Sequence, residues 1–159
     1  MRNLTYTREI FQKYEIEIDG LSYSLVDKTN KVGDYHGIMK NLIELFNSEY
    51  NWEGMFTIED VLNRIEDNQK LYILFLNSKE IGYLWINELD NENCFCYNIY
   101  VTKKIKRPKN SAVWFISKVY EWNLLKYKKI KLQIESWNHA ALRIHLELTK
   151  NHLAKQIFD

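Results

Sequence analysis

The residues best suited to chemistry lie at the junction between an apolar segment and a cationic segment. Cys94–Val101 is rich in aromatic and β-branched residues, which predicts a strand. The nine residues that follow carry five cations and the only proline: Lys103, Lys104, Lys106, Arg107, Lys109 and Pro108. A helix is expected from Ser111. A strand that leads through a loop into a helix N-terminus offers backbone N–H groups and a positive dipole, which suit a pyrophosphate. The alternative is a solvated basic loop.

A second polar cluster lies further along the chain. Ile130, Leu132 and Ile134 alternate with polar residues, which predicts a strand. Asn138 suits the N-cap of a last helix that runs to about Lys150. On that helix His145 shares a face with apolar residues, so it is either a satisfied core residue or a functional group. We expect Cys94 and Cys96 to be reduced core thiols. Two ligands one residue apart make no zinc site, so no metal is expected.

The remaining segments supply the framework around these clusters. Asp19-Gly20 lies between alternating stretches of Tyr14–Val26 and predicts an N-terminal hairpin within residues 1–26. Val32–Tyr50 has helical spacing, and Thr57 with Asp60 forms a capping box for a second helix. Leu71–Leu76 and Ile81–Ile86 predict another hairpin, with a turn at 77–80. The expected order is β-β-α-α-β-β-β-α-β-α in a single domain, 1–159.

Composition and charge exclude several classes of protein. The chain has 159 residues, 46% of them hydrophobic, as one globular core requires. Residues 1–100 carry 9 cations and 17 anions (−8), and residues 101–159 carry 13 and 4 (+9), so the net charge of +1 is polarised. No apolar run could span a membrane, and the N-terminus lacks a secretory core, so a cytoplasmic location is expected. Near-neutral charge disfavours nucleic acid, despite the basic stretches 103–109 and 126–131.

The stretch Ile130–His145 resembles the GNAT superfamily of acyl-CoA-dependent N-acyltransferases. That family has a strand followed by Asn-x-x-Ala and, four residues on, a position that is usually Tyr; here these positions are Asn138, Ala141 and His145. The likeness covers roughly Leu21–Asn151 and includes the element order. It implies an α/β (α+β) fold: a mixed, mostly antiparallel sheet with a splayed parallel pair, 94–101 and 130–135, flanked by helices on both faces.

The resemblance further implies a cofactor-binding half, 94–151, with acetyl-CoA as acyl donor and its pantetheine arm between the splayed strands. The family's Gln/Arg-x-x-Gly-x-Gly/Ala turn corresponds to Lys106, Lys109 and Ser111. Glycine allows the backbone to approach a phosphate closely. Lys109 in its place implies a variant loop path, a side-chain contact to phosphate, or loss of the site. The implied cofactor contacts are Ile99, Tyr100, Val101, Lys106, Arg107, Lys109, Asn110, Ser111, Ala112, Asn138 and Ala141.

The resemblance also assigns catalytic roles. His145 takes the position of the family's Tyr acid, where an imidazolium could protonate the departing thiolate at neutral pH. The strand backbone near Ile99–Val101 is the implied oxyanion donor. Candidates for the general base are Glu88, Glu92 and Tyr97, and a water relay is the alternative. By the same resemblance, the loop at Trp52 flanks the acceptor pocket, and Tyr50 and Glu53 could contact a sugar or an amine. The alternative is an ordinary hydrophobic anchor of the loop.

These expectations together describe an N-acetyltransferase that acts on a small-molecule amine. The acidic first half favours an amino sugar or similar amine. The alternatives are a non-catalytic GNAT-fold protein that binds CoA or a protein partner, and an acyltransferase whose donor is carried on a carrier protein. Thr149-Lys150 replaces the family's usual Gly-Phe, and nine residues are too few for its two closing strands. An exposed strand edge seeks a partner, so a homodimer is expected to complete the sheet.

Overall fold

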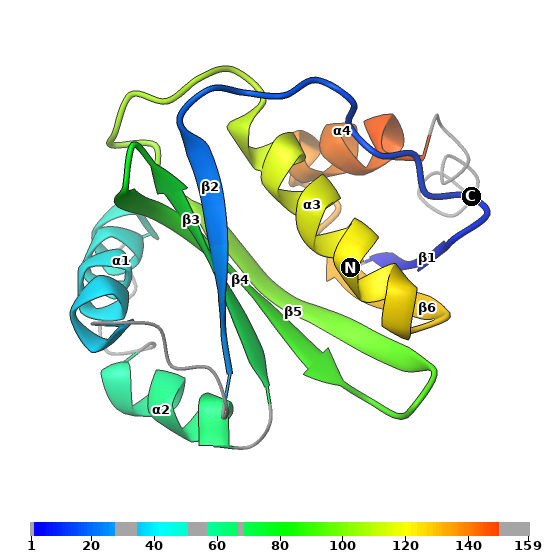
Figure 1. Ribbon diagram of the computed structural model, residues 1–159, viewed down its shortest axis with the longest axis horizontal. Helices are drawn as coiled ribbons and strands as arrows, with labels where there is room; N and C mark the ends of the chain where they lie inside the picture. The colour runs from blue at the N-terminus through cyan, green and yellow to red at the C-terminus, as the bar shows by residue number, and fades with distance from the viewer. Residues whose placement is uncertain (1, 28–34, 51–56, 67–68, 150–159) are drawn as a thin grey trace. The chain divides into compact units, whose positions relative to one another are not determined.

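The computed structural model describes residues 2–27, 35–50, 57–66 and 69–149 (Figure 1). Its elements appear in the predicted order β-β-α-α-β-β-β-α-β-α. In the described ranges, no helix is long and apolar enough to cross a membrane. The elements are β1 (Arg2–Thr7), β2 (Leu21–Val26), α1 (Tyr35–Tyr50), α2 (Ile58–Glu66), β3 (Lys70–Leu76), β4 (Lys79–Glu88), β5 (Asn93–Val101), α3 (Ser111–Lys126), β6 (Lys129–Ile134) and α4 (His139–Glu147).

The six strands form a mixed sheet in the order β1-β6-β5-β4-β3-β2. The pairs β1·β6, β2·β3 and β3·β4 are antiparallel, whereas β5 and β6 are parallel. The parallel register runs from Asn93↔Lys129 to Cys96↔Leu132 and ends there. β5 continues to Val101 and β6 to Ile134 beyond that register. The predicted fold class, a mostly antiparallel sheet with one parallel pair and flanking helices, is confirmed.

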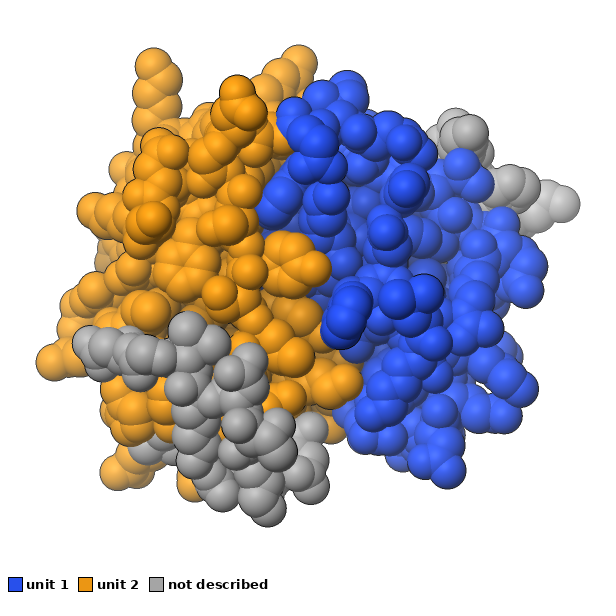
Figure 2. All heavy atoms as spheres, viewed as in Figure 1, with its two compact units in different colours: residues 1–17, 88–97, 112–159 blue, residues 18–87, 98–111 orange. Residues whose placement is uncertain are grey.

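The chain divides into two compact units, shown in different colours in Figure 2. Unit 1 contains residues 1–17, 88–97 and 112–159, and unit 2 contains residues 18–87 and 98–111. The first part of β5 therefore belongs to unit 1 and its last part, with the basic loop, to unit 2. Each unit has buried apolar residues of its own.

The first strand differs from the prediction. The predicted hairpin across Tyr14–Val26 is wrong, because β1 pairs with β6 and β2 pairs with β3. In β1 the alternation buries Leu4 and Tyr6, whereas the alternation at residues 15–18 would bury little, since Ile16 is 65% exposed. Gly20 does form a turn, with φ +85°. Because β1 covers the edge of β6, the argument that a second subunit must complete that edge no longer holds.

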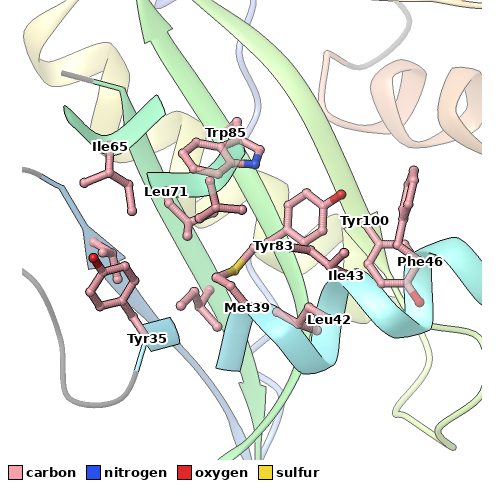
Figure 3. Close-up of a cluster of buried hydrophobic side chains, with 13 residues drawn as sticks. Tyr35, Met39, Leu42, Ile43, Phe46, Ile65, Leu71, Tyr83, Trp85 and Tyr100 are labelled. Carbon is pink, nitrogen blue, oxygen red and sulfur yellow. The ribbon is translucent and has the colours of Figure 1, made fainter. Parts of the chain in front are cut away.

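The core of unit 2 lies between α1, α2 and one face of β2–β5 (Figure 3). Phe46 of α1 packs edge-on against Tyr100 of β5, with ring centroids 5.3 Å apart. The predicted capping box is confirmed: the Thr57 amide donates to the Asp60 carboxylate over 2.9 Å, and the Asp60 amide donates to the Thr57 hydroxyl over 3.3 Å. It begins α2 at Ile58.

One glycine sets the spacing between β4 and β5 within unit 2. A Cβ on Gly82 would lie 2.4 Å from the Tyr100 carbonyl oxygen and 3.1 Å from the Cα of Val101. Backbone atoms cannot give way as a flexible side chain can, so only glycine fits there. Just beyond this contact, the Thr102 amide donates to the Ile81 carbonyl over 2.8 Å and fixes the point at which the basic loop begins.

Unit 1 is organised around α3. Five consecutive residues of that helix, Val113–Ser117, are buried, which confirms that it is packed on more than one side. β6 presents Ile130, Leu132 and Ile134 to the interior and its polar residues to solvent, as the alternation predicts. Cys94 and Cys96 are both buried free thiols, in agreement with the sequence.

Candidate functional site

The basic loop of unit 2 is held at its start by a carboxylate from α1. Glu49 Oε1 accepts hydrogen bonds from the Thr102 hydroxyl at 2.6 Å, the Lys103 amide at 2.9 Å and the Lys104 amide at 3.3 Å. Burial by itself would raise the pKa of Glu49, but these hydrogen bonds outweigh burial and the pKa is lowered. The carboxylate therefore stays ionised at neutral pH, and the first residues of the loop are hydrogen-bonded to this negatively charged side chain.

Further contacts within the loop fix its path to α3. The Arg107 guanidinium donates to the Thr102 carbonyl, and the Lys104 ammonium contacts the Ser48 hydroxyl. At the other end, the Ser111 hydroxyl donates to the Pro108 carbonyl over 2.5 Å. Two of the five cations are thus engaged with the protein itself.

The left-handed residue of the loop is Asn110, with φ +68°. Asparagine tolerates this conformation better than most residues. Lys109 is not left-handed, so its replacement of glycine does not strain the backbone at that position. Its Cβ nevertheless occupies the space that a glycine would leave open to a phosphate. Contact between the Lys109 side chain and a phosphate stays a prediction.

The other three loop cations, Lys103, Lys106 and Lys109, are exposed. Within the described part of the chain, none of them forms an ion pair with a carboxylate. Their ammonium groups are therefore available to an anion in solution. Lysine contacts phosphate as a point charge on a flexible stem and does not need a closely approaching backbone.

In unit 1, the Asn-x-x-Ala segment begins α4. The Asn138 side-chain oxygen accepts a hydrogen bond from the Ala141 amide over 3.2 Å, so Asn138 is the N-cap, as predicted. Ala141 is half-buried in the first turn of the helix. The contacts of both residues to a pantetheine arm stay predictions, because capping accounts for Asn138 by itself.

His145 lies in the core of unit 1 and contacts the first strand. It is 4% exposed, and its Nδ1 lies 2.6 Å from the Tyr6 hydroxyl. Its ring stacks on Tyr120 with centroids 6.3 Å apart. Burial lowers the pKa of His145 to about 4 and raises that of Tyr6, so the imidazole and the phenol are both neutral at pH 7. The imidazolium expected from the sequence does not fit this environment.

The remaining candidate residues differ in their exposure and in their ion pairs. Glu88 lies 4.0 Å from the ammonium of Lys126, Glu92 lies 3.0 Å from that of Lys128, and Tyr97 is 48% exposed on β5. Their service as a general base stays a prediction. Tyr100 is buried, and Ile99, Val101 and Ala112 are half-buried. The substrate residues Trp52 and Glu53 and the side chain of Tyr50 lie outside the described residues.

Sequence reasoning missed two features of unit 2. Glu49 is one of two carboxylates of α1, with Glu44, and no local pattern marks it as the residue that meets the loop. A surface hollow of about 450 Å³ also lies beside the loop, and it mixes charges of both signs. It has no assigned role. Its lining is Asn41, Glu44, Leu45, Lys79, Glu80, Lys104 and Ile105.

Sequence comparison does not show which family this chain belongs to. No protein-family model matches it. A dermonecrotic toxin of Sicarius terrosus, StSicTox-betaIF1, is 31% identical over 94 residues, which are 58% of this chain and 31% of the toxin. The chain spans about a third of the length of that relative. Because the match covers only part of each protein, the activity of the toxin is not inferred for this chain.

Solved structures share the fold of this chain over most of its length. An aminoglycoside acetyltransferase from an uncultured soil metagenomic sample, in complex with trehalose, has a TM-score of 0.64 at 17% identity, over 83% of this chain and 90% of that one. A GNAT-family acetyltransferase from Streptococcus pneumoniae has a TM-score of 0.58 at 16% identity, over 80% and 82%. The protein yncA from Salmonella typhimurium, solved with acetyl-CoA, has a TM-score of 0.60 at 15% identity, over 82% and 79%.

The chain therefore has the fold of the GNAT superfamily of acetyltransferases, as the resemblance at Ile130–His145 implied. At these low identities the likeness concerns the fold. The chemistry of this chain has to be argued from its own residues.

Proposed function

We propose that this protein is an N-acetyltransferase that transfers an acetyl group from acetyl-CoA to the amine of a small molecule. The observation that carries the proposal is the cationic loop between β5 and α3, with Lys103, Lys106 and Lys109 exposed, in a fold shared with acetyltransferases. An aminoglycoside acetyltransferase among the similar structures favours an amino sugar as acceptor. The acidic character of residues 1–100 supports a cationic acceptor as well.

The residues present suit the phosphates of this donor. The loop starts on the ionised Glu49 and turns at Asn110 without a glycine. Lys106 and Lys109 are the side chains we assign to the diphosphate, and the N-terminus of α3, which begins at Ser111, would add its positive dipole. When bound, acetyl-CoA supplies an activated acetyl group as a thioester. The amine, after its ammonium form has given a proton to a base, attacks the thioester carbonyl and forms the C–N bond. The C–S bond then breaks, and the departing CoA thiolate takes up the second proton of the nitrogen, which leaves the acetylated amine and free CoA thiol.

The roles of the protein's own groups follow from their surroundings. Neutral His145 cannot act as an imidazolium acid at pH 7. Any proton donation has to come from a neutral imidazole, and we assign the Tyr6 hydroxyl as donor to Nδ1, which leaves the proton on Nε2. Glu88 and Tyr97 are exposed and are our candidates to take the proton of the amine, directly or through water. The backbone near Ile99–Val101 is our candidate for the oxyanion donor.

Incubation with acetyl-CoA and a panel of amino sugars and other amines tests this proposal. We expect acetylated product and stoichiometric release of free thiol. A lack of both, with acetyl-CoA binding intact, would support the non-catalytic alternative. Turnover with an acyl-carrier protein but not with CoA would move the donor to a carrier-bound phosphopantetheine, which the basic loop also suits. A cytoplasmic location and the oligomeric state stay predictions.

A further inference from the structure

Glu49 occupies an unusual place for a carboxylate. It lies at the end of α1, yet its hydrogen bonds reach the first residues after β5: the Thr102 hydroxyl at 2.6 Å and the backbone amides of Lys103 and Lys104 at 2.9 and 3.3 Å. Thr102 is fully buried. One oxygen, Oε1, thus gathers three donors in a segment expected to present donors to a phosphate.

The amides that Glu49 uses are no longer available to a ligand. In a glycine-rich phosphate loop, successive backbone N–H groups point at the anion and the absent Cβ lets it approach. Here the amides of Lys103 and Lys104 point at an internal anion. Lys109, with its Cβ, takes the glycine position, and Asn110 makes the turn. Backbone recognition is therefore reduced at the start of the loop, and within the turn at 106–111 the Ser111 amide already donates to the Pro108 carbonyl over 3.3 Å, so positive side chains remain.

We propose that Glu49 is a positioning residue that replaces the missing glycine turn: it clamps the loop from within, so that Lys106 and Lys109 bind the diphosphate of CoA through their side chains. This inference rests on the proposed function, because it assumes that the loop meets CoA. Two further hydrogen bonds complete the clamp. The Arg107 guanidinium donates to the Thr102 carbonyl, and the Ser111 hydroxyl donates to the Pro108 carbonyl.

The electrostatics are consistent with a clamp. Burial opposes the charge on Glu49, but the hydrogen bonds outweigh it and lower the pKa, so the carboxylate is charged at neutral pH. A fixed negative charge beside five cations offsets their mutual repulsion before a ligand arrives. Glutamine at this position would keep a hydrogen-bond acceptor and lose the charge, and alanine would lose both. The two substitutions therefore separate geometry from charge.

The test compares two ligands and three variants by calorimetry. CoA carries the diphosphate, and pantetheine carries the arm without it. For Glu49→Ala we expect CoA affinity to fall by about tenfold or more, and pantetheine affinity to change by less than about twofold. Glu49→Gln should recover most of the CoA affinity at low salt. Glu44→Ala removes another exposed carboxylate from α1 and should leave both affinities unchanged.

Amide hydrogen exchange provides a second readout that does not depend on activity. The amides of Lys103 and Lys104 should be protected in the wild type without ligand and lose protection in Glu49→Ala. CoA should add no further protection at these two amides, since they face Glu49. Strong new protection there on CoA binding would show backbone recognition and would overturn the inference.

The outcomes separate this inference from the function on which it rests. If the wild type does not bind CoA, the proposed function fails and the clamp fails with it. If the wild type binds CoA and Glu49→Ala binds it equally well, only the clamp is refuted. An equal loss for CoA and pantetheine would show general damage to unit 2 and would also refute it.

Discussion

The environment of His145 gives a quantitative prediction about stability and pH. Its pKa is lowered from 6.5 to about 4 by burial, so the unfolded chain binds a proton more readily than the folded protein does. A depressed folded-state pKa contributes stability that is complete above pH 6.5 and is lost as the pH falls toward 4. The shift corresponds to about 3 kcal/mol in all, of which about 2 kcal/mol is lost between pH 7.5 and pH 5.

The assay is chemical denaturation of the wild type and of His145→Phe at pH 7.5, 6 and 5. Phenylalanine keeps an aromatic ring against Tyr120 but does not titrate, and the other three histidines of the sequence, His36, His139 and His152, are common to both proteins. The stability difference between the two should therefore shift by about 2 kcal/mol in favour of the variant at pH 5. A difference that does not change with pH, or an imidazole that titrates near 6.5 by NMR, would refute the buried neutral histidine. It would also restore His145 as an imidazolium acid.

Three other substitutions test the packing of each unit. Tyr6→Phe removes the donor to His145 and leaves a buried nitrogen unpaired, so thermal denaturation at pH 7.5 should show a loss of about 1–3 kcal/mol. Gly82→Ala places a Cβ 2.4 Å from the Tyr100 carbonyl oxygen, so we expect a similar loss of stability. CoA binding should also weaken, because β5 leads into the basic loop. Unchanged stability would show that β4 and β5 can move apart to make room. Asp60→Ala should cost about 1 kcal/mol by breaking the capping box, whereas the neighbouring Glu59→Ala, which leaves those bonds intact, should cost less.

Much of the fold could be predicted because its signals are local. The capping box at Thr57–Asp60, the alternation of β6 and the N-cap at Asn138 each depend on a few neighbouring residues, and each is confirmed. The order of the elements followed from these signals together. Local periodicity is informative where one face of an element is buried and the other is solvated.

The failures have long-range causes. Residues 14–18 alternate as a strand would, but no partner buries Ile16, whereas β1 forms because β6 offers an edge more than a hundred residues away. The hydrogen bond between Tyr6 and His145 has the same origin, and so does the burial that keeps the histidine neutral at pH 7. Glu49 was missed for a related reason: its function depends on a loop that is distant in sequence. A pairing between two segments that are far apart in the chain produces no periodic pattern in the sequence of either segment.

The central claim is that the cationic loop binds acetyl-CoA, and calorimetric titration tests it most directly. Acetyl-CoA would be added to the wild type and to the double variant Lys106→Ala/Lys109→Ala at two salt concentrations. We predict micromolar binding by the wild type that weakens in the double variant and at higher salt, as contacts between lysines and phosphates require. No binding, or equal affinity in the two proteins, would contradict the account.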